Sequence, residues 1–495
     1  MTDTIDRELQ DTTREELDAL LDAATAAMPA LVASPPAERA DWLRAAADAL
    51  DAAADRLIPL AVEESHLPVP RLTGELTRTT FQLRLFATVL DEGAYLQATI
   101  DHADPDWGMG PRPDLRRVLR PLGPVAIWAA SNFPFAFSVA GGDTASALAA
   151  GVPVLLKAHP GHPRLSAATA EVLLGALRSA GAPEGVFALV TGVEIGRDLV
   201  TDPRIAAASF TGSLRGGRAL FDLAVSRPTP IPFYGELGSV NPVFVTAAAA
   251  RDRAEDVATG FAGSMSLGVG QFCTKPGLLF VPAGSGLPDR IAERLRDVGG
   301  APMLNAGIAE GYAKALGGLA AHADVRVLAG STTPDATPAP TLLATTAEAL
   351  LADPHGLTEE AFGPTALVVE YADKEQLLAA AAAFDGQLTA TVHAVDEDPD
   401  AADLLPLLAE RAGRVLVNGW PTGVSVTWAM EHGGPYPATT SVQTTSVGTS
   451  AIDRWLRPVS YQSTPDPLLP PPLQEANPWR IPRRVDGVLE PAPRR

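Results

Sequence analysis

The chain has 495 residues, which is too long for one ordinary hydrophobic core and predicts two or three domains. A hydrophobic fraction of 46% and a charged fraction of 20% are typical of globular proteins and exclude a largely disordered chain. The formal net charge of −21 argues against a nucleic-acid partner, because a phosphate backbone requires a basic surface.

The N-terminus lacks the basic start and apolar run of a secretory signal and carries Asp3, Asp6, Glu8 and Asp11. Residues 122–142 contain no charge, but prolines, an asparagine and a glycine pair interrupt them. We expect a buried strand, a loop and a buried helix there, not a membrane span. The sequence therefore predicts a cytoplasmic protein with no membrane partner.

Helices are predicted in the first hundred residues. Residues 14–62 are rich in Ala with recurring Leu, which indicates amphipathic helices broken near Ser34-Pro35-Pro36. The same periodicity predicts a helix over 71–91.

From Leu119 onward, short apolar runs alternate with helical segments such as 164–180, which is the pattern of βαβ units in a parallel sheet. The expected strands are 125–128, 153–156, 186–190 and 206–210, and in a second unit 242–245, 278–281, 366–369 and 415–417. Residues 283–289 and 330–340 are expected as surface loops, and the proline-dense tail from 464 as an extended arm. The pattern predicts a doubly wound α/β enzyme with two lobes.

A single cysteine, Cys273, excludes an intramolecular disulfide and any metal site built from several cysteines. By itself a lone cysteine is more often a small buried apolar residue than a nucleophile. Only four of the 38 basic residues are lysines. Lys314 and Lys374 lie in Ala-rich helical segments and are expected to be solvated. Lys157 and Lys275 lie in apolar surroundings, where the choice of lysine over arginine suggests that a compact ammonium group is needed.

Six short segments occur in a characteristic order and approximate spacing. They are Ser131-Asn132-Phe133-Pro134, Lys157 after an apolar strand, Phe210-Thr211-Gly212-Ser213, Gly235-Glu236-Leu237-Gly238-Ser239, Gly270-Gln271-Phe272-Cys273 and Glu359-Glu360-Ala361-Phe362-Gly363-Pro364. Together they resemble the aldehyde dehydrogenase superfamily. The segments 271–277 and 432–439 are closer to the branch of α-ketoglutarate semialdehyde dehydrogenases and an NADP-dependent bacterial fatty aldehyde dehydrogenase.

The resemblance implies an α/β, aldehyde dehydrogenase-like fold of two Rossmann-like lobes with parallel sheets and a small oligomerisation arm. It divides the chain into N-terminal helices with an NAD(P)-binding domain (1–235), a catalytic domain (236–436) and a return to the cofactor domain with a proline-rich C-terminal arm (437–495). It also implies a homodimer or homotetramer.

The resemblance assigns Cys273 as the nucleophile that holds the substrate as a thioester, and Glu236 as the base that activates water. Asn132 and the Cys273 backbone N–H would bind the oxyanion. We expect a nearby positive group, with Lys275 a candidate, or a helix N-terminus to lower the pKa of Cys273, and an apolar site to raise that of Glu236. The alternatives for Glu236 and Asn132 are a helix or turn cap and a turn residue.

A Gly-x-Gly-x-x-Gly fingerprint is absent from the sequence. The resemblance instead places the cofactor pyrophosphate at Thr211, Gly212 and Ser213, where a strand meets a helix. Lys157 would bind the adenosine ribose. Glu360 would bind the nicotinamide ribose with Phe362 packed nearby.

Pro160 stands three residues after Lys157, where many NAD-preferring members carry a carboxylate. The sequence therefore predicts NADP or NAD as the cofactor, with no repulsion of a 2′-phosphate. His159 and His162 have a spacing that suggests a metal site, but no Cys, Asp or Glu adjoins them, and we predict no metal.

The leading prediction is oxidation of a small-molecule aldehyde to a carboxylate, with 2,5-dioxopentanoate (α-ketoglutarate semialdehyde) as substrate. A medium- or long-chain fatty aldehyde is the alternative substrate. For that case, aromatic residues are available to line a funnel, although core packing is the commoner role: Phe135, Phe137, Phe272, Trp420 and Trp428. An acylating, CoA-dependent enzyme is a further alternative, but Glu236 argues against it. A catalytically silent subunit is another, and the presence of the complete set of site residues argues against that.

Overall fold

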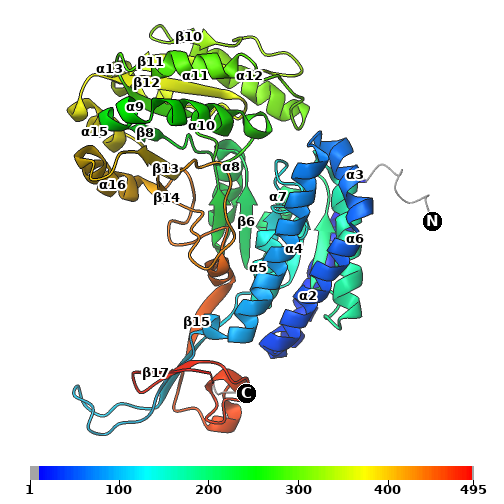
Figure 1. Ribbon diagram of the computed structural model, residues 1–495. Coiled ribbons are helices and arrows are strands. Elements are labelled where there is room, and N and C mark those ends of the chain that lie inside the picture. The colour runs from blue at the N-terminus through cyan, green and yellow to red at the C-terminus, as the bar shows by residue number, and fades with distance from the viewer. Residues whose placement is uncertain (1–9, 493–495) are drawn as a thin grey trace.

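The computed structural model describes residues 10–492, which form two α/β lobes and an arm (Figure 1). The acidic start at Asp3, Asp6 and Glu8 lies outside the described residues, as do the outer limits of the expected first and last domains. Within the described part of the chain, no helix is long and apolar enough to span a membrane.

Four helices precede the first sheet, and they confirm the helical prediction and its break. They are α1 (Arg14–Ala33), α2 (Pro36–Ala52), α3 (Ala54–Ser65) and α4 (Val69–Glu92). Thr13 and Glu16 form a capping box that starts α1, and Pro36 at the first turn of α2 needs no backbone donor.

The first lobe is built on a five-stranded parallel sheet with the order β5-β4-β3-β6-β7. The strands are β3 (Val125–Trp128), β4 (Val154–Lys157), β5 (Phe187–Val190), β6 (Ala207–Thr211) and β7 (Phe233–Glu236), with crossover helices α5 (Gly142–Ala150), α6 (Pro163–Ser179), α7 (Glu194–Thr201) and α8 (Leu214–Val225). Val125 and Ile127 face the α2, α4, α5 and α6 layer, while Ala126 and Trp128 face α1, α7 and α8. The first four strands were predicted, and β7 was not.

The second lobe contains a seven-stranded sheet with the order β10-β11-β12-β9-β8-β13-β14, parallel except for the β10–β11 pair. Its strands are β8 (Val243–Val245), β9 (Leu278–Pro282), β10 (Arg326–Ala329), β11 (Thr341–Thr346), β12 (Thr365–Tyr371), β13 (Gln387–His393) and β14 (Ala412–Val417). Strands β10, β11 and β13 were not predicted.

The helices of the second lobe are α9 (Ala247–Asp252), α10 (Ala254–Ser266), α11 (Leu287–Leu295), α12 (Ala306–Ala321), α13 (Ala347–Ala352), α14 (Pro354–Leu357), α15 (Lys374–Ala382) and α16 (Pro399–Arg411). The predicted loop 283–289 is wrong at its end, because α11 begins at Leu287 with Pro288 in its first turn. The loop predicted at 330–340 is confirmed between β10 and β11. Lys314 is exposed on α12, as expected for a solvated residue.

The arm is a third sheet, made from segments distant in sequence, with the order β15-β2-β1-β16-β17. Its strands are β1 (Thr99–Asp101), β2 (Leu115–Pro121), β15 (Leu456–Gln462), β16 (Arg483–Val485) and β17 (Val488–Glu490). Short 3₁₀ turns at 94–96, 449–455, 466–468 and 471–473 connect it to the first lobe and to the tail. In Figure 1 the cyan and red segments lie side by side below the first lobe.

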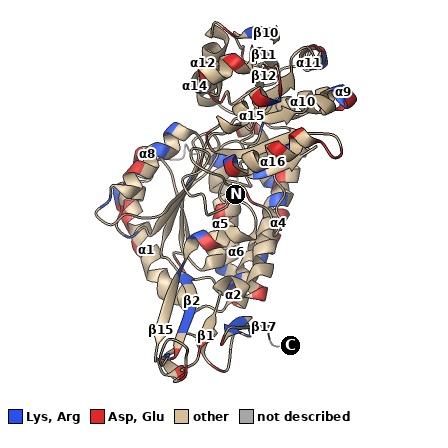
Figure 2. Ribbon diagram, turned by 90° about the vertical axis from the view of Figure 1, so that its left-hand side faces the viewer, with Lys and Arg blue, Asp and Glu red and all other residues tan. Residues whose placement is uncertain are grey.

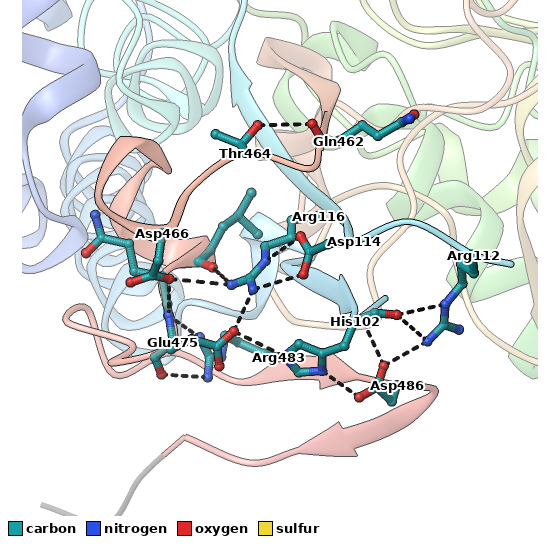
Figure 3. Close-up of polar contacts among 12 residues, drawn as sticks. His102, Arg112, Asp114, Arg116, Gln462, Thr464, Asp466, Glu475, Arg483 and Asp486 are labelled. Carbon is teal, nitrogen blue, oxygen red and sulfur yellow. Dashed lines mark hydrogen bonds and ion pairs between the residues drawn. The ribbon is translucent and has the colours of Figure 1, made fainter. Parts of the chain in front are cut away.

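Ion pairs join the two halves of the arm (Figure 3). The ring nitrogens of His102 lie 2.6 Å from an Asp486 oxygen and 3.1 Å from a Glu475 oxygen. Arg116, on the arginine-rich strand β2 that is blue in Figure 2, lies 2.6 Å from Glu475 and 3.0 Å from Asp114. These contacts fix the tail against the strands that follow α4.

Replacing His102 by Gln is expected to destabilise the protein in a pH-dependent way. The hydrogen bond to Asp486 raises the pKa of His102, so its stabilising effect is present at mildly acidic pH and is lost as pH rises through that raised pKa. The melting temperature should fall by about 1–3 °C at pH 6 and by less at pH 9, since exposed pairs contribute little. Thermal denaturation of H102Q and the exposed control H355Q measures this, and equal shifts at both pH values would contradict it.

Candidate active site

The loop that carries Cys273 is fixed by its backbone. It follows α10 and a 3₁₀ turn (Leu267–Gly270), and Gly270 adopts a φ of +64° against the Gly363 carbonyl, where a Cβ would overlap that group. The Asn241 side-chain amide donates to the carbonyl oxygens of Cys273 (2.8 Å) and Lys275 (2.9 Å). The position of the thiol is therefore set by the second lobe.

Cys273, His432 and Glu236 form a compact cluster. The Cys273 Sγ lies 3.6 Å from His432 Nε2, and the same nitrogen lies 2.8 Å from Glu236 Oε1. The Ser446 hydroxyl donates to Glu236 Oε2 at 2.6 Å. His432 and Glu236 are 1% and 4% exposed, so the thiol faces a carboxylate that is buried but hydrogen-bonded on both oxygens.

Two segments distant in sequence bring this cluster together. Glu236 is the last residue of β7, which lies at the edge of the first-lobe sheet. After β14 the chain returns along that edge: Leu237 N–H donates to Ala438 O (2.8 Å), and Thr440 N–H to Gly235 O (3.0 Å). His432 and Ser446 belong to this returning segment, so the first lobe and the returning chain place the base beside the thiol of the second lobe.

Asn132 lies in the loop between β3 and α5 and is oriented toward the nucleophile loop. Its side-chain Nδ2 donates to the carbonyl oxygen of Gln271 at 3.2 Å. An amide nitrogen carries two N–H groups, so the second is available for an oxygen atom bound near Cys273. The arrangement suits a donor that does not lose its proton near neutral pH.

The expectation of a lowered Cys273 pKa is wrong for this structure. Burial, followed by the Glu236 charge, raises the pKa of the thiol well above its ordinary value, and Arg78 opposes this only weakly. Lys275 does not act on the thiol, because its ammonium is buried and donates to the carbonyl oxygens of Ala361 (2.9 Å) and Thr365 (2.7 Å). The sulfur is therefore a neutral thiol that needs a base.

The expectation of a raised Glu236 pKa is also wrong. Burial raises it, but the His432 charge and hydrogen bond, the Ser446 hydroxyl and the Cys273 thiol together outweigh burial, and the pKa is lowered. Sequence reasoning predicted the apolar surroundings and missed the hydrogen-bond partners. Glu236 is therefore ionised beside a protonated thiol.

A cavity of about 530 Å³ extends from Cys273 across the carboxyl ends of β3, β4, β6 and β7. All the residues predicted for catalysis and cofactor binding line it: Asn132, Lys157, Thr211, Gly212, Ser213, Glu236, Cys273, Glu360 and Phe362. Such an edge of an open α/β sheet is where nucleotides bind. The structure thus brings together residues separated by more than two hundred positions.

The groups around this cavity fit a dinucleotide. Ser213 caps α8, whose first turn carries no acidic residue, so its free backbone N–H groups suit a pyrophosphate. The Lys157 ammonium has no ion-pair partner within the described residues, and burial lowers its pKa. Glu360 fits only because position 238 is glycine, where a Cβ would lie 2.5 Å from its carboxylate.

The two histidines near Lys157 have different surroundings. His162 is buried with its Nδ1 3.1 Å from the Ser166 hydroxyl and its Nε2 3.0 Å from the Ala130 carbonyl oxygen. His159 lines the cavity, and burial lowers its pKa to about 3. His162 thus has a structural role, and His159 is a neutral side chain on the cavity wall.

His432 and Ser446 were missed as functional residues. The segment 432–439 carried a family likeness, but His432 lies 159 positions from Cys273, and no local spacing connects them. Asn241 and its role in holding the nucleophile loop were missed for the same reason. Only an alignment or a structure could reveal these partners.

Comparison with known proteins identifies the family of the chain. The profile of the "Aldehyde dehydrogenase family" matches residues 1–457. The α-ketoglutaric semialdehyde dehydrogenase 2 of Azospirillum brasilense is 48% identical over 443 residues, covering 88% of this chain and 84% of the relative. The α-ketoglutaric semialdehyde dehydrogenase of Acinetobacter baylyi is 45% identical over 440 residues, with the same coverage.

Among solved structures, aldehyde dehydrogenase 21 from Physcomitrella patens superposes with a TM-score of 0.76 at 21% identity, covering 92% of each chain. The class defined by these matches is an oxidoreductase that acts on aldehydes with NAD or NADP. The chain belongs to the aldehyde dehydrogenase family.

Replacing Glu236 by Gln is expected to accelerate alkylation of the free enzyme. Removal of the charge lowers the Cys273 pKa, because Glu236 is the largest charge that opposes thiolate formation. Iodoacetamide labelling at pH 7.5 should be faster by roughly 10-fold, the effect of about one pKa unit. Since Cys273 is the only cysteine, mass spectrometry reports a single adduct. E359Q, which also lines the cavity, is the control, and an unchanged rate in E236Q would disprove the charge effect.

Proposed function

We propose that this enzyme oxidises 2,5-dioxopentanoate to 2-oxoglutarate through a thioester on Cys273. The observation that carries the mechanism is the Cys273–His432–Glu236 cluster at one end of a nucleotide-sized cavity. The substrate assignment is supported by two relatives, 48% and 45% identical, that are α-ketoglutaric semialdehyde dehydrogenases.

In the first half-reaction, the Cys273 sulfur forms a bond to the aldehyde carbon, and the thiol proton passes to the Glu236–His432 pair. Because the thiol is neutral in the free enzyme and Glu236 is ionised, this proton transfer must accompany attack. The carbonyl oxygen becomes an oxyanion, to which Asn132 Nδ2 and the Cys273 N–H donate. NAD or NADP, when bound, accepts the hydride from this carbon.

Before the second half-reaction, the thiol proton held by the Glu236–His432 pair is released to solvent. The ionised Glu236 then removes a proton from water as the water oxygen bonds to the thioester carbon. The C–S bond then breaks, the carboxylate leaves, and the sulfur regains a proton. Ser446 and His432 hold the Glu236 carboxylate in place for this step. A water-activating base supports hydrolysis over acyl transfer to CoA.

For the cofactor, we propose that NADP is accepted as well as NAD. Pro160 and His159 line the cavity beside Lys157, so the position three residues after the lysine offers no carboxylate to repel a 2′-phosphate. Lys157 supplies a cation there. Lys157 would bind the 2′-phosphate of NADP, and Glu360 would bind the nicotinamide ribose.

A straight-chain aldehyde is the second candidate substrate, and one observation favours it. Phe133, Phe137 and Phe272 form an aromatic cluster beside Cys273, with ring centroids 5.3 and 5.4 Å apart. Such a cluster can bind an alkyl chain. The other predicted aromatic residues do not form part of this cluster: Phe135 packs in the first-lobe core, Trp420 stacks on His393, and Trp428 is exposed.

Dehydrogenase activity is expected to depend on Cys273 and to favour the dioxo acid. Purified enzyme would be assayed with 2,5-dioxopentanoate and pentanal, each with NAD⁺ and NADP⁺. We expect a higher kcat/KM for the dioxo acid, NADPH formation alongside NADH, and loss of both in C273A. Turnover by C273A would disprove the thioester mechanism, and a preference for pentanal would favour the second candidate substrate.

We also propose that the arm joins subunits into a homodimer or homotetramer. Strand β15 lies at an edge of the arm sheet and, among the strands of residues 10–492, pairs with β2 alone, so its outer backbone groups are available to another strand. Light scattering in solution should give two or four times the 51.5 kDa chain mass. A monomeric mass would contradict the proposal.

A further inference from the structure

Arg78 is a half-buried cation to which no counter-ion is bonded within residues 10–492. It lies in the N-terminal half of α4. Its Nε and Nη2 atoms are buried and have no hydrogen-bond partner within the described residues. Unpaired buried donors on a guanidinium are costly, so their retention points to a ligand.

The two unpaired nitrogens define what the ligand is. Nε and Nη2 lie on one edge of the planar guanidinium, and this edge binds both oxygens of a carboxylate in parallel hydrogen bonds. Burial lowers the pKa of Arg78, and the nearby carboxylates and the thiol oppose this. A bound carboxylate would supply the missing charge.

The charged side chains near Arg78 already have other hydrogen-bond or ion-pair partners. Glu75, the nearest carboxylate on the same helix, lies 2.6 Å from Arg71 and accepts from the backbone N–H groups of Phe135 (2.8 Å) and Ala136 (3.0 Å). Arg414, which also acts electrostatically on Cys273, donates to the carbonyl oxygens of Pro421 and Gly423. Arg414 Nε is also unpaired within the described residues, but of these three arginines Arg78 alone has both Nε and Nη2 unpaired, which leaves one whole edge of its guanidinium free.

The position of Arg78 connects it to the reacting thiol. Its guanidinium carbon lies 5.2 Å from the ring centroid of Phe137, and that ring lies 6.5 Å from the His432 ring, which contacts Cys273. Arg78 also interacts electrostatically with both Cys273 and Glu236. The aromatic rings beside Arg78 make its surroundings less polar than water, which strengthens an ion pair formed there.

We propose that Arg78 binds the remote carboxylate of an acidic aldehyde substrate while the aldehyde carbon lies at Cys273. The inference rests on the proposed function and deepens it, because it assigns the specificity for a carboxylate-bearing substrate to one residue. The Phe133 and Phe137 rings hold the guanidinium through cation–π contacts, with its carbon 5.7 and 5.2 Å from the ring centroids. Arg78 is a specificity residue and takes no part in proton transfer.

The test compares R78M and R78K with the wild type and with R84Q. Arg84 is the matched control, because it lies on the same helix and pairs with Asp48 and Asp51 at the surface. For R78M we expect kcat/KM for 2,5-dioxopentanoate to fall by about 100-fold, mainly through KM, as expected for a lost buried ion pair. Activity on pentanal should change less than threefold, and R78K should recover part of the loss.

A binding measurement tests the role of Arg78 separately from the identity of the substrate. Glutarate, a five-carbon dicarboxylate, should bind the wild type and R84Q in calorimetry and should bind R78M at least 10-fold more weakly. Equal losses on both aldehydes, or unchanged glutarate binding in R78M, would overturn the role of Arg78. If the wild type prefers pentanal while Arg78 still binds glutarate, the proposed substrate fails and the carboxylate site stands.

Discussion

A buried carboxylate held beside a half-buried thiol is the constraint on which this active site depends. Glu236 is 4% exposed, and burial alone would neutralise it. His432 at 2.8 Å and Ser446 at 2.6 Å keep it ionised, while its charge keeps the Cys273 thiol protonated. In the resting enzyme the thiol is therefore the acid and the carboxylate the base, and in the proposed mechanism a proton passes between them as the sulfur attacks.

This constraint requires the two lobes to be packed together. The thiol is fixed by Asn241 in the second lobe, whereas the carboxylate ends an edge strand of the first. The chain that returns after β14 pairs with that edge and supplies His432. Neither lobe alone contains the cluster. A change that loosens the packing between the lobes should therefore also disrupt the active site.

A second buried pair lies on the cofactor side of the cavity. Burial lowers the pKa of Lys275 to about 8 and raises that of Glu360 to about 7, with each partner's charge opposing the effect on the other. Lys275 also holds the 361–365 backbone through two carbonyl oxygens. The charge beside the proposed nicotinamide ribose position thus changes near neutral pH, and the Glu360 charge also raises the pKa of Cys273.

The sequence by itself was sufficient to locate the purely apolar strands and the site residues that lie in recognisable motifs. Val125–Trp128 was predicted residue for residue, because a short buried parallel strand is a continuous apolar run. Strand β13 was missed, because Gln387, Thr389 and Thr391 look polar, although all three are buried. Distant groups hydrogen-bond to two of them: the Val240 N–H donates to Gln387 Oε1, and the Thr389 hydroxyl donates to Asn241 Oδ1. No local sequence pattern contains those partners.

Tertiary structure alone decided the ionisation of the site and its specificity. The sequence indicated Cys273, Glu236 and Asn132, but the directions of both pKa shifts follow from His432, Ser446 and burial. Lys275, two residues from the thiol, donates to backbone carbonyl oxygens, while Arg78, almost two hundred residues away, acts on it. Residue type is a property of the sequence, whereas pKa and pairing depend on which distant groups folding brings within a few ångströms.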